Sequence, residues 1–424
     1  MAPDVRCTVE AVWRIESAKI VAALARMVRD VGTAEDLAQD VLVTALEKWP
    51  RTGMPDNPGA WLMAAAKRRA IDGFRRRRRK EKAERELGRD LELKTELTRL
   101  TAESSIREEI EDDLLRLIFT VCHPLLPAEG RVALTLRALV GLTSPEIARA
   151  FLVSETTVAQ RIVRAKRTLR EAQVPFEVPS GPDLAPRLAS VLEVIYLIFN
   201  EGYASTAGED WIRPELCEDA LRMGRVLAAL ASGESEVHGL VALMELQSSR
   251  LAARVGPGGE PILLLEQDRM RWDRLLIRRG LAALERARER ARERGGPLGP
   301  YALQASIAAC HAVASKAEET DWARIAALYD GLVQLLPSPV VALNRAVSYA
   351  MAYGAEAGLE LVDELVGHPA LQAYHLLPSV RGDFLAKLGR CSEAETEFLR
   401  AASLTRNGRE RKLLLERAAS CAGS

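Results

Sequence analysis

The chain has 424 residues, of which 48% are hydrophobic, and its 59 basic residues balance 59 acidic ones. This length and apolar content allow several hydrophobic cores, so we expect three or four modules. The N-terminus lacks the pattern of a signal peptide, and the longest stretch without formal charge, residues 295–315, contains prolines and polar residues unsuited to a membrane span. We therefore expect a cytoplasmic protein with no membrane contact.

The first distinctive elements are two predicted helices. One covers residues 34–48, and a turn rich in Pro, Asn and Gly at 55–59 opens the other. Residues 61–82 are intensely basic, which suits a polyanion, and Trp61 and Phe74 add flat apolar groups on which an unpaired base can stack. The alternative is a solvated basic helix with Trp61 in the core.

A helix-turn-helix is predicted after an acidic stretch that we interpret as a linker. Thr143 and Glu146 form a capping box for the first helix, and Ser154 caps a second helix over residues 155–171. The first turns of such a second helix meet base edges in the major groove, and its later cations meet phosphates. The alternative is an ordinary helical hairpin. The apolar face of the second helix consists of Val158, Ile162, Ala165 and Leu169.

Four prolines within residues 173–186 predict a stiff spacer before new structure begins. The strongly apolar stretch 188–199 follows and leads into the tetrapeptide Asn200-Glu201-Gly202-Tyr203. Glu201 has the chemistry of a catalytic acid or base. Because no His, Cys or Ser is arranged nearby as a base and nucleophile pair, a cap or packing role is favoured for this tetrapeptide.

Pairs of helices recur in the last part of the chain. An amphipathic pattern over residues 269–287 and a helix over 301–314 precede three pairs, whose second helices start near residues 338, 370 and 408. This spacing is close to the repeat of about 34 residues in tetratricopeptide proteins. Stacked hairpins of this kind leave a concave surface, either for a partner protein or for the chain's own N-terminal domains.

The six cysteines lie far apart and form no CxxC pair, which argues against a disulfide framework and a zinc site. Cys122 beside His123 comes nearest to a pair of metal ligands. Adjacent residues on a helix point in different directions, so a buried thiol is the favoured interpretation. We predict no metal, no cofactor and no catalytic residue.

Three motifs, taken in order, resemble a bacterial RNA polymerase sigma factor of the extracytoplasmic-function class, which keeps only the second and fourth sigma domains. They are AEDLAQDVL at residues 34–42, NPGAWL followed by RAID within 57–72, and the helix-turn-helix residues 147–166. The Asn200 tetrapeptide resembles a signature of a subclass with a C-terminal helical extension. Two positions depart from the family pattern: Arg68 replaces an Asn, and Leu152 replaces a turn Gly, which predicts a different turn geometry.

The resemblance implies an all-α protein that acts by binding rather than by catalysis. It implies that the helix 34–48 docks on the clamp helices of core RNA polymerase and that the helix from Ala60 captures an extruded base of the minus-10 element. The first helix would turn Leu37, Val41, Ala45 and Leu46 toward its own core. The implied polymerase contacts are Asp36, Gln39, Asp40 and Glu47. The candidate minus-10 contacts are Trp61, Lys67, Arg68, Asp72, Arg75 and Arg76. The candidate minus-35 contacts are Ser154, Thr156, Thr157, Gln160, Arg161, Arg164 and Arg167.

The expected partners are core RNA polymerase, promoter DNA, and an intramolecular or protein partner for the C-terminal helical domain. That domain is expected to regulate the sigma domains, in a direction that the sequence leaves open. A conventional helix-turn-helix regulator with a tetratricopeptide-like sensor is the main alternative, but it does not explain the helix 34–48 or the basic helix. An enzyme tethered to DNA is a third alternative, but no nucleotide-binding, metal-binding or nucleophile motif supports it.

The expected domains are sigma domain 2 at 1–95, an acidic linker at 96–113, sigma domain 4 at 114–172, the spacer at 173–186, a helical extension at 187–295 and tetratricopeptide-like repeats at 296–424.

Overall fold

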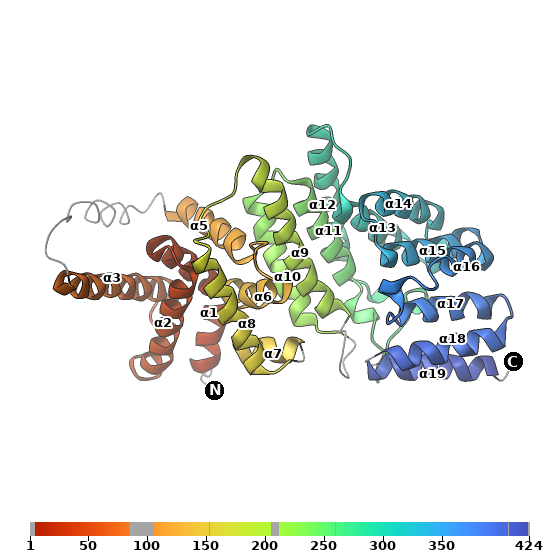
Figure 1. Cartoon of the computed structure of the whole chain (residues 1–424), viewed down its shortest axis with the longest axis horizontal. Helices are drawn as coiled ribbons and strands as arrows, with labels where there is room; N and C mark the ends of the chain where they lie inside the picture. Colours follow the sequence, from red (N-terminus) through yellow and green to blue (C-terminus); the bar gives the residue numbers. More distant parts are fainter. Residues whose placement is uncertain are drawn as a thin grey trace. The chain divides into compact units, whose positions relative to one another are not determined.

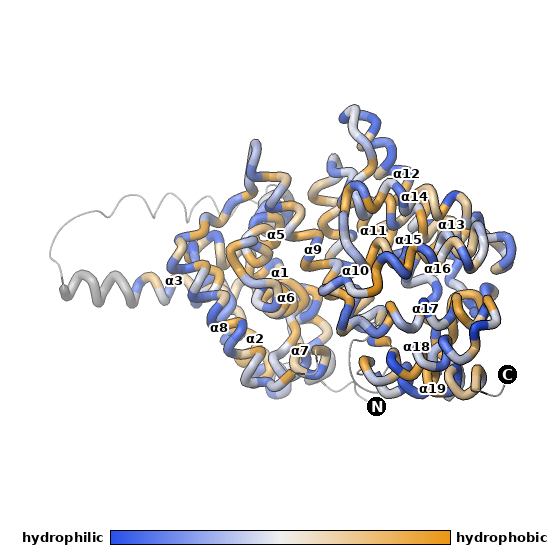
Figure 2. Tube along the Cα trace, turned by 45° about the vertical axis from the view of Figure 1, so that its right-hand side comes forward, coloured by the Kyte–Doolittle hydropathy of each residue, from blue (hydrophilic) through white to orange (hydrophobic). Residues whose placement is uncertain are grey.

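The computed structural model describes residues 5–84, 106–151, 153–204, 212–258, 260–405 and 407–422, and the side chains of these residues except 5–7, 76–84 and 106–110. The described residues form helices and no β-strand, so the predicted all-α fold is confirmed (Figure 1). Hydrophobic and hydrophilic positions alternate along most helices, as expected where each helix buries one face (Figure 2). Within the described ranges, no helix is long and apolar enough to cross a membrane.

The chain divides into two compact units, Met1–Ile195 and Tyr196–Ser424, which we call unit 1 and unit 2. The division falls inside helix α9 (Leu184–Tyr203). Unit 1 contains both predicted sigma domains and the first half of α9. Unit 2 contains the second half of α9 and all later helices.

Unit 1 begins with three helices, α1 (Val5–Val28), α2 (Val31–Thr52) and α3 (Pro58–Glu84). Asp30 caps α2 by accepting a hydrogen bond from the Thr33 amide at 2.9 Å. The expected inward residues Val41 and Ala45 are fully buried, whereas Leu37 and Leu46 are only partly buried. The core face of α2 consists of Ala34, Ala38, Val41, Ala45 and Trp49.

The second half of unit 1 contains α5 (Ile106–Val121), α6 (Ala128–Thr135), the π-helix η1 (Leu136–Val140), α7 (Ser144–Phe151) and α8 (Glu155–Glu171). The predicted linker was too long at its C-terminal end, because residues 106–113 are helical. Asp113 of this helix is buried and lies 3.1 Å from Arg26 of α1. A carboxylate paired in this way belongs to a packed helix rather than to a solvated segment. Residues 96–105 lie outside the described part of the chain.

The predicted spacer was also too long, because α9 begins at Leu184, directly after a 3-10 turn at Gly181–Asp183. Pro186 lies in the first turn of α9, where a helix needs no backbone N–H donor, so this proline does not break the helix. The first half of α9 is bonded into unit 1. Arg187 Nη2 donates to the Phe119 carbonyl at 2.8 Å, and Ser190 Oγ donates to the Cys122 carbonyl at 2.5 Å.

Unit 2 continues with α10 (Pro214–Leu230), α11 (Ser235–Ser248), α12 (Arg274–Glu293) and α13 (Pro300–Val313). Helix α11 is buried along most of its length and packs against both α12 and α13. At Gly239 a Cβ atom would lie 2.7 Å from the Ala302 amide nitrogen, so glycine permits the close crossing of α11 and α13.

The predicted helix pairs are present in the rest of unit 2, and each helix packs on the next. Their second helices begin at Pro339, Leu376 and Gly408. The middle start is later than expected because residues 369–371 form a separate 3-10 turn. The six helices are α14 (Trp322–Leu335), α15 (Pro339–Tyr353), α16 (Ala355–Asp363), α17 (Leu376–Lys387), α18 (Cys391–Leu404) and α19 (Gly408–Ala422).

Candidate nucleic-acid and polymerase interfaces

The turn that precedes α7 has the predicted capping box. The Thr143 amide donates to Glu146 Oε2 at 2.7 Å, and the Glu146 amide donates to Thr143 Oγ1 at 3.4 Å. Arg14 of α1 also donates to Glu146, at 2.9 Å. Burial raises the pKa of Glu146, but these hydrogen bonds outweigh this effect and hold the pKa below its usual value. The carboxylate therefore stays ionised and ties α7 to α1.

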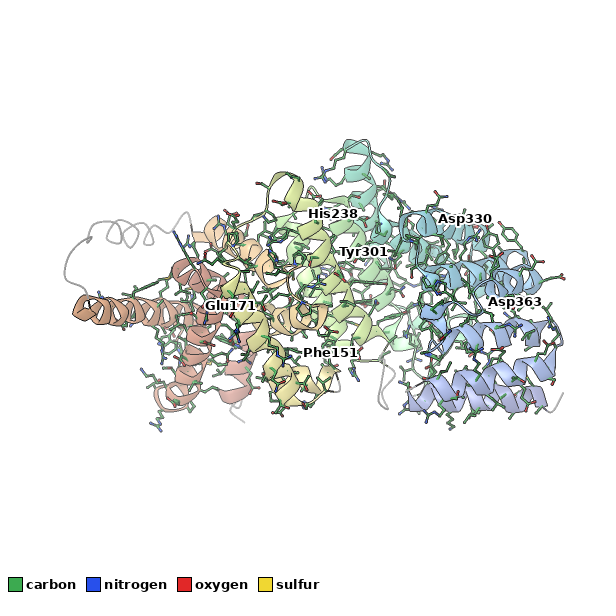
Figure 3. The ribbon with its side chains drawn as sticks, in the orientation of Figure 1. Phe151, Glu171, His238, Tyr301, Asp330 and Asp363 are labelled. Carbon is green, nitrogen blue, oxygen red and sulfur yellow. The ribbon has the colours of Figure 1, made fainter. Side chains whose placement is uncertain are left out.

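Helix α8 confirms the predicted cap and the predicted apolar face. Ser154 Oγ accepts from the Thr157 amide at 3.1 Å, and Val158, Ile162, Ala165 and Leu169 are the buried residues of the helix. Figure 3 labels Phe151 and Glu171, the last residues of α7 and α8. Leu152, at which a different turn geometry was predicted, lies outside the described residues.

The predicted minus-35 residues lie together on the outer face of α8. Gln160, Arg161 and Arg164 form no hydrogen bond or ion pair with any residue that the structure describes. Arg167 is paired with Glu171 one turn later, at 2.6 Å. The exposed members are Ser154, Thr156, Gln160, Arg164 and Arg167, and the half-buried members are Thr157 and Arg161. The first turns of α8 thus present polar groups and cations that are available to an external ligand.

The predicted minus-10 residues are distributed along α3. Trp61 is half-buried and packs edge-on against Trp49, with ring centroids 5.3 Å apart, so part of its ring already belongs to the core. Lys67 is half-buried. The side chains of Arg68, Asp72 and Arg75 are exposed, and Asp72 lies 3.8 Å from Arg75. The side chain of Arg76 lies outside the described part of α3.

The predicted polymerase-binding residues lie on α2. Asp40 is exposed and forms an ion pair with Arg69 of α3 at 3.0 Å. Arg69 also donates to Thr44 at 2.6 Å, so it joins α3 to α2. Gln39 is half-buried and Glu47 is exposed.

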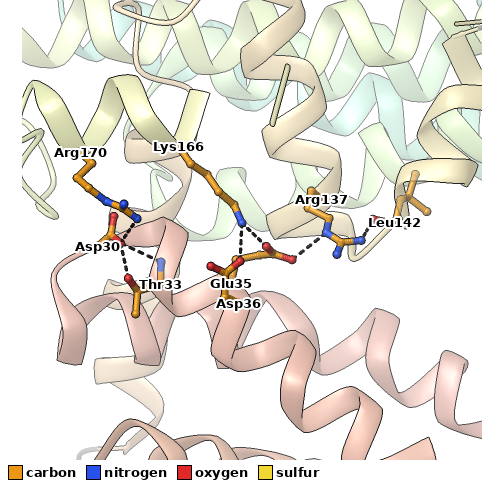
Figure 4. Close-up of polar contacts among 8 residues, drawn as sticks. All are labelled: Asp30, Thr33, Glu35, Asp36, Arg137, Leu142, Lys166 and Arg170. Atoms are coloured by element: carbon orange, nitrogen blue, oxygen red, sulfur yellow. Dashed lines mark hydrogen bonds and ion pairs between the residues drawn. The ribbon is translucent and has the colours of Figure 1, made fainter. Parts of the chain in front are cut away.

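An ion-pair cluster joins the start of α2 to α8, and we call it the α2–α8 bridge (Figure 4). Lys166 Nζ donates to both Glu35 and Asp36, the latter at 3.0 Å. Arg170 donates to Asp30 at 2.9 Å. Burial raises the pKa of Asp30, but the hydrogen bonds from Thr33 and Arg170 outweigh this effect and hold the pKa below its usual value. The bridge consists of Asp30, Glu35, Asp36, Lys166 and Arg170.

Glu35 is the buried centre of the α2–α8 bridge. Its side chain is only 4% exposed, and it accepts from Arg137 Nε at 2.8 Å as well as from Lys166. Glu35, Lys166 and Arg170 were not predicted as site residues, because partners more than 100 residues apart leave no local pattern in the sequence. Asp36 was predicted as a polymerase contact, and its ion pair with Lys166 already engages it within the chain.

Residues of the tetrapeptide at the end of α9 pack against neighbouring side chains. Glu201 forms an ion pair with Arg213, and both side chains are largely buried. Tyr203 stacks on Phe199, and the guanidinium of Arg254 lies 3.7 Å from the centre of its ring. These contacts agree with the packing alternative for Glu201 rather than with the catalytic one.

Cys122 is buried, as the sequence analysis favoured. Its Sγ lies 3.4 Å from Thr135 Oγ1. Burial raises the pKa of the Cys122 thiol to about 11, so the sulfur stays protonated near neutral pH.

Comparison with known families decides the identity of unit 1. Residues 15–80 match sigma-70 region 2, and residues 116–169 match sigma-70 region 4. These two regions, together with 26% identity over 172 residues to a probable ECF RNA polymerase sigma factor, show that the chain belongs to the extracytoplasmic-function class of sigma factors. Beyond the two sigma regions, residues 187–288 of this sigma factor match a family of unknown function, DUF6596, so the C-terminal extension is present.

Two relatives of this sigma factor are informative. An uncharacterized protein of Rhizobium meliloti (strain 1021) is 42% identical over 393 residues, which cover 92% of this chain and 90% of the relative. The probable ECF RNA polymerase sigma factor SigI of Mycobacterium tuberculosis (strain ATCC 25618 / H37Rv) is 26% identical over 172 residues, which cover 40% of this chain and 57% of that protein. The first similarity extends over both units, whereas the second is confined to a shorter part.

Proposed function

We propose that this sigma factor binds core RNA polymerase through α2, opens promoter DNA with α3 and reads the minus-35 element with α8, in the cytoplasm. The observation that carries the proposal is the order of elements within unit 1, where α2, the basic α3 and a capped helix-turn-helix follow one another as sigma-70 regions 2 and 4. The role is one of binding, and the polymerase supplies the chemistry.

The exposed cations of α3 support a role at the minus-10 element. Opening a duplex costs about 1 to 2 kcal/mol of stacking free energy per base step. A protein offsets this cost by capturing an extruded base and by holding the strand through its phosphates. Arg68 and Arg75 are exposed and suited to phosphates, and the partly exposed ring of Trp61 offers a stacking surface.

Replacing Arg161 by alanine should change which minus-35 sequence is preferred, because Arg161 lies in the second turn of α8 beside the exposed Gln160. A base contact contributes about 1 to 3 kcal/mol of discrimination. Arg167→Ala is the matched control. That arginine lies nearer the helix end and should contact phosphates without sequence preference. Binding to a library of minus-35 variants measures the difference.

The Arg161 variant should redistribute affinity among the library members, whereas the Arg167 variant should weaken all of them alike. An equal loss on every member after Arg161→Ala would assign Arg161 to the phosphate backbone instead.

The α2–α8 bridge competes with polymerase binding in this proposal. Asp36 pairs with Lys166 within the chain, so its use as a polymerase contact requires that the bridge open. A protein whose binding-competent form is only partly populated shows a correspondingly weaker apparent affinity. Despite this reduction in affinity, the full chain should co-elute with core polymerase in size-exclusion chromatography, and variants of the exposed α2 residues Asp40 and Glu47 should reduce this co-elution. Wild-type protein that elutes apart from core polymerase would contradict the proposal.

We further propose that unit 2 controls the sigma domains in cis. Helix α9 supports this proposal because it supplies Arg187 and Ser190 to unit 1 and Tyr203 to unit 2. Covalent linkage also gives unit 2 a high effective concentration near unit 1, so weak contacts suffice.

A chain that ends at Ile195 should differ several-fold from the full chain in promoter output at matched concentration. The cut follows Ile195, at the end of unit 1, so that the shortened chain keeps the bonds of Arg187 and Ser190 to unit 1. Hydrogen exchange checks that unit 1 stays folded. Equal output from the two chains would leave unit 2 as an independent binding module.

A further inference from the structure

Unit 2 contains a partly open cavity of about 360 Å³, which we call the extension cavity. Its lining residues come from α9, α11, α13, α14 and α15, together with the segment before α12. Small-molecule sites in proteins have volumes of about 300 to 1,000 Å³ and combine apolar walls with a few placed polar groups. The extension cavity lies at the small end of this range, so it suits a compact ligand.

The charge of the lining favours an anion. Arg250 is the charged residue among the described residues that line the cavity, and no Asp or Glu lines it. Two nitrogens of Arg250, Nε and Nη2, donate to Gln247 Oε1 at 3.2 and 2.8 Å. Nη1 has no hydrogen-bond partner among the residues that the structure describes, so it can donate to a ligand.

His311 does not add a second charge to the lining. Burial, together with the cations Arg250 and Arg269, lowers the pKa of His311 to about 3. The imidazole is therefore neutral near pH 7, and the cavity carries a single positive charge. A ligand with one negative group matches this charge.

The aromatic lining favours a flat ligand. Trp272, Trp322, Tyr196 and Tyr329 all line the cavity, and the ring of Trp322 packs edge-on against His311 at 5.1 Å. Aromatic walls bind flat rings by offset stacking or edge-to-face contacts. Burial raises the pKa of Tyr329 to about 12, so its hydroxyl remains a neutral donor.

We propose that the extension cavity binds a small aromatic carboxylate, whose anionic group pairs with Arg250 and whose ring packs against the tryptophans. A carboxylate matches the planar guanidinium and forms charge-assisted hydrogen bonds with it. This proposal goes beyond promoter recognition. It concerns unit 2 alone and does not depend on polymerase or DNA.

Isothermal titration of the full chain with indole-3-acetate tests the proposal, and the neutral indole-3-acetamide serves as the matched ligand. We expect the acid to bind at least about tenfold more tightly than the amide, because only the acid pairs with the cation. Arg250→Gln should weaken binding of the acid by at least about tenfold, and Arg250→Lys, which keeps the charge, should lose less. Arg278→Gln, an exposed arginine of α12 outside the lining, should bind as the wild type does.

Three results would overturn the proposal: no saturable binding of the acid up to about 1 mM, equal binding of acid and amide, or equal losses in the Arg250→Gln and Arg278→Gln variants. The comparison of acid with amide uses the wild-type chain, so it holds even where a variant folds poorly. Because the titration contains neither polymerase nor DNA, its failure would leave the proposed sigma function untouched.

Discussion

Replacing Glu35 by alanine should weaken the contacts of α2 with η1 and α8 by about 3 kcal/mol in total, because Arg137 lies in η1 and Lys166 in α8. The Glu35 carboxylate is 4% exposed and is the acceptor for both Arg137 and Lys166, whose side chains are 18% and 15% exposed. Removing one member of a buried ion pair is costly because the remaining charge stays buried without its partner. Arg137 is the residue left in this state, since Lys166 keeps Asp36 as a partner.

Hydrogen exchange of α2, η1 and α8 in the full chain measures this effect, and about 3 kcal/mol corresponds to an increase in exchange rate of roughly a hundredfold. Asp36→Ala is the matched control. It removes a neighbouring carboxylate that also contacts Lys166 but is 73% exposed, so it should cost less than about 1 kcal/mol. Wild-type exchange in the Glu35 variant, or equal exchange in the two variants, would show that the buried carboxylate does not hold the helices together.

The same two variants separate the bridge from polymerase binding. If the bridge must open for α2 to bind core polymerase, Glu35→Ala should bind core more tightly by up to about tenfold. Asp36→Ala should bind more weakly, because it removes a proposed polymerase contact.

Replacing Arg269 by alanine should destabilise unit 2 by about 3 kcal/mol. Arg269 is buried, and its Nη1 donates to the carbonyls of His311 at 2.6 Å and Ala314 at 2.8 Å. These carbonyls lie at the C-terminal end of α13, where a helix has no backbone donors of its own. The Nη2 atom donates to Thr320 at 3.1 Å, so one guanidinium satisfies three acceptors, two of them in buried hydrogen bonds.

Thermal unfolding of the full chain, followed with hydrogen exchange at the end of α13, tests this prediction. Arg271→Ala is the control, because Arg271 lies with Arg269 in the 3-10 turn Arg269–Arg271 but is exposed. Arg269→Lys should also be destabilised, since an ammonium group lacks the planar fork that reaches acceptors on two sides. Equal stability of the Arg269 and Arg271 variants would show that the acceptors find other partners.

Local signals in the sequence predicted the helices to which we assign minus-35 recognition. Ser154 and the apolar positions from Val158 to Leu169 defined α8 correctly, because a cap and a helical period act over a few residues. The Thr143 and Glu146 capping box was predicted for the same reason. The tandem helix pairs of unit 2 were recognised from their repeated spacing.

Contacts between distant residues could not be predicted in this way. The pairing of Glu35 with Lys166 joins positions 131 residues apart, and Asp113 was assigned to the linker because its partner, Arg26, lies on α1. Pro186 looked like a helix breaker, although a proline in the first turn is harmless. The extension cavity is formed by side chains from five helices and by a segment outside them, and none of these helices carries a local sign of it.

Run-off transcription with purified core polymerase and the full chain, on fragments of the host genome, tests the proposed initiation function most directly. We predict discrete products that require both proteins, and the Arg161→Ala variant should change which fragments yield them. Sequence-specific DNA binding by the chain alone, together with no run-off product on any fragment, would contradict this function and favour a conventional helix-turn-helix regulator.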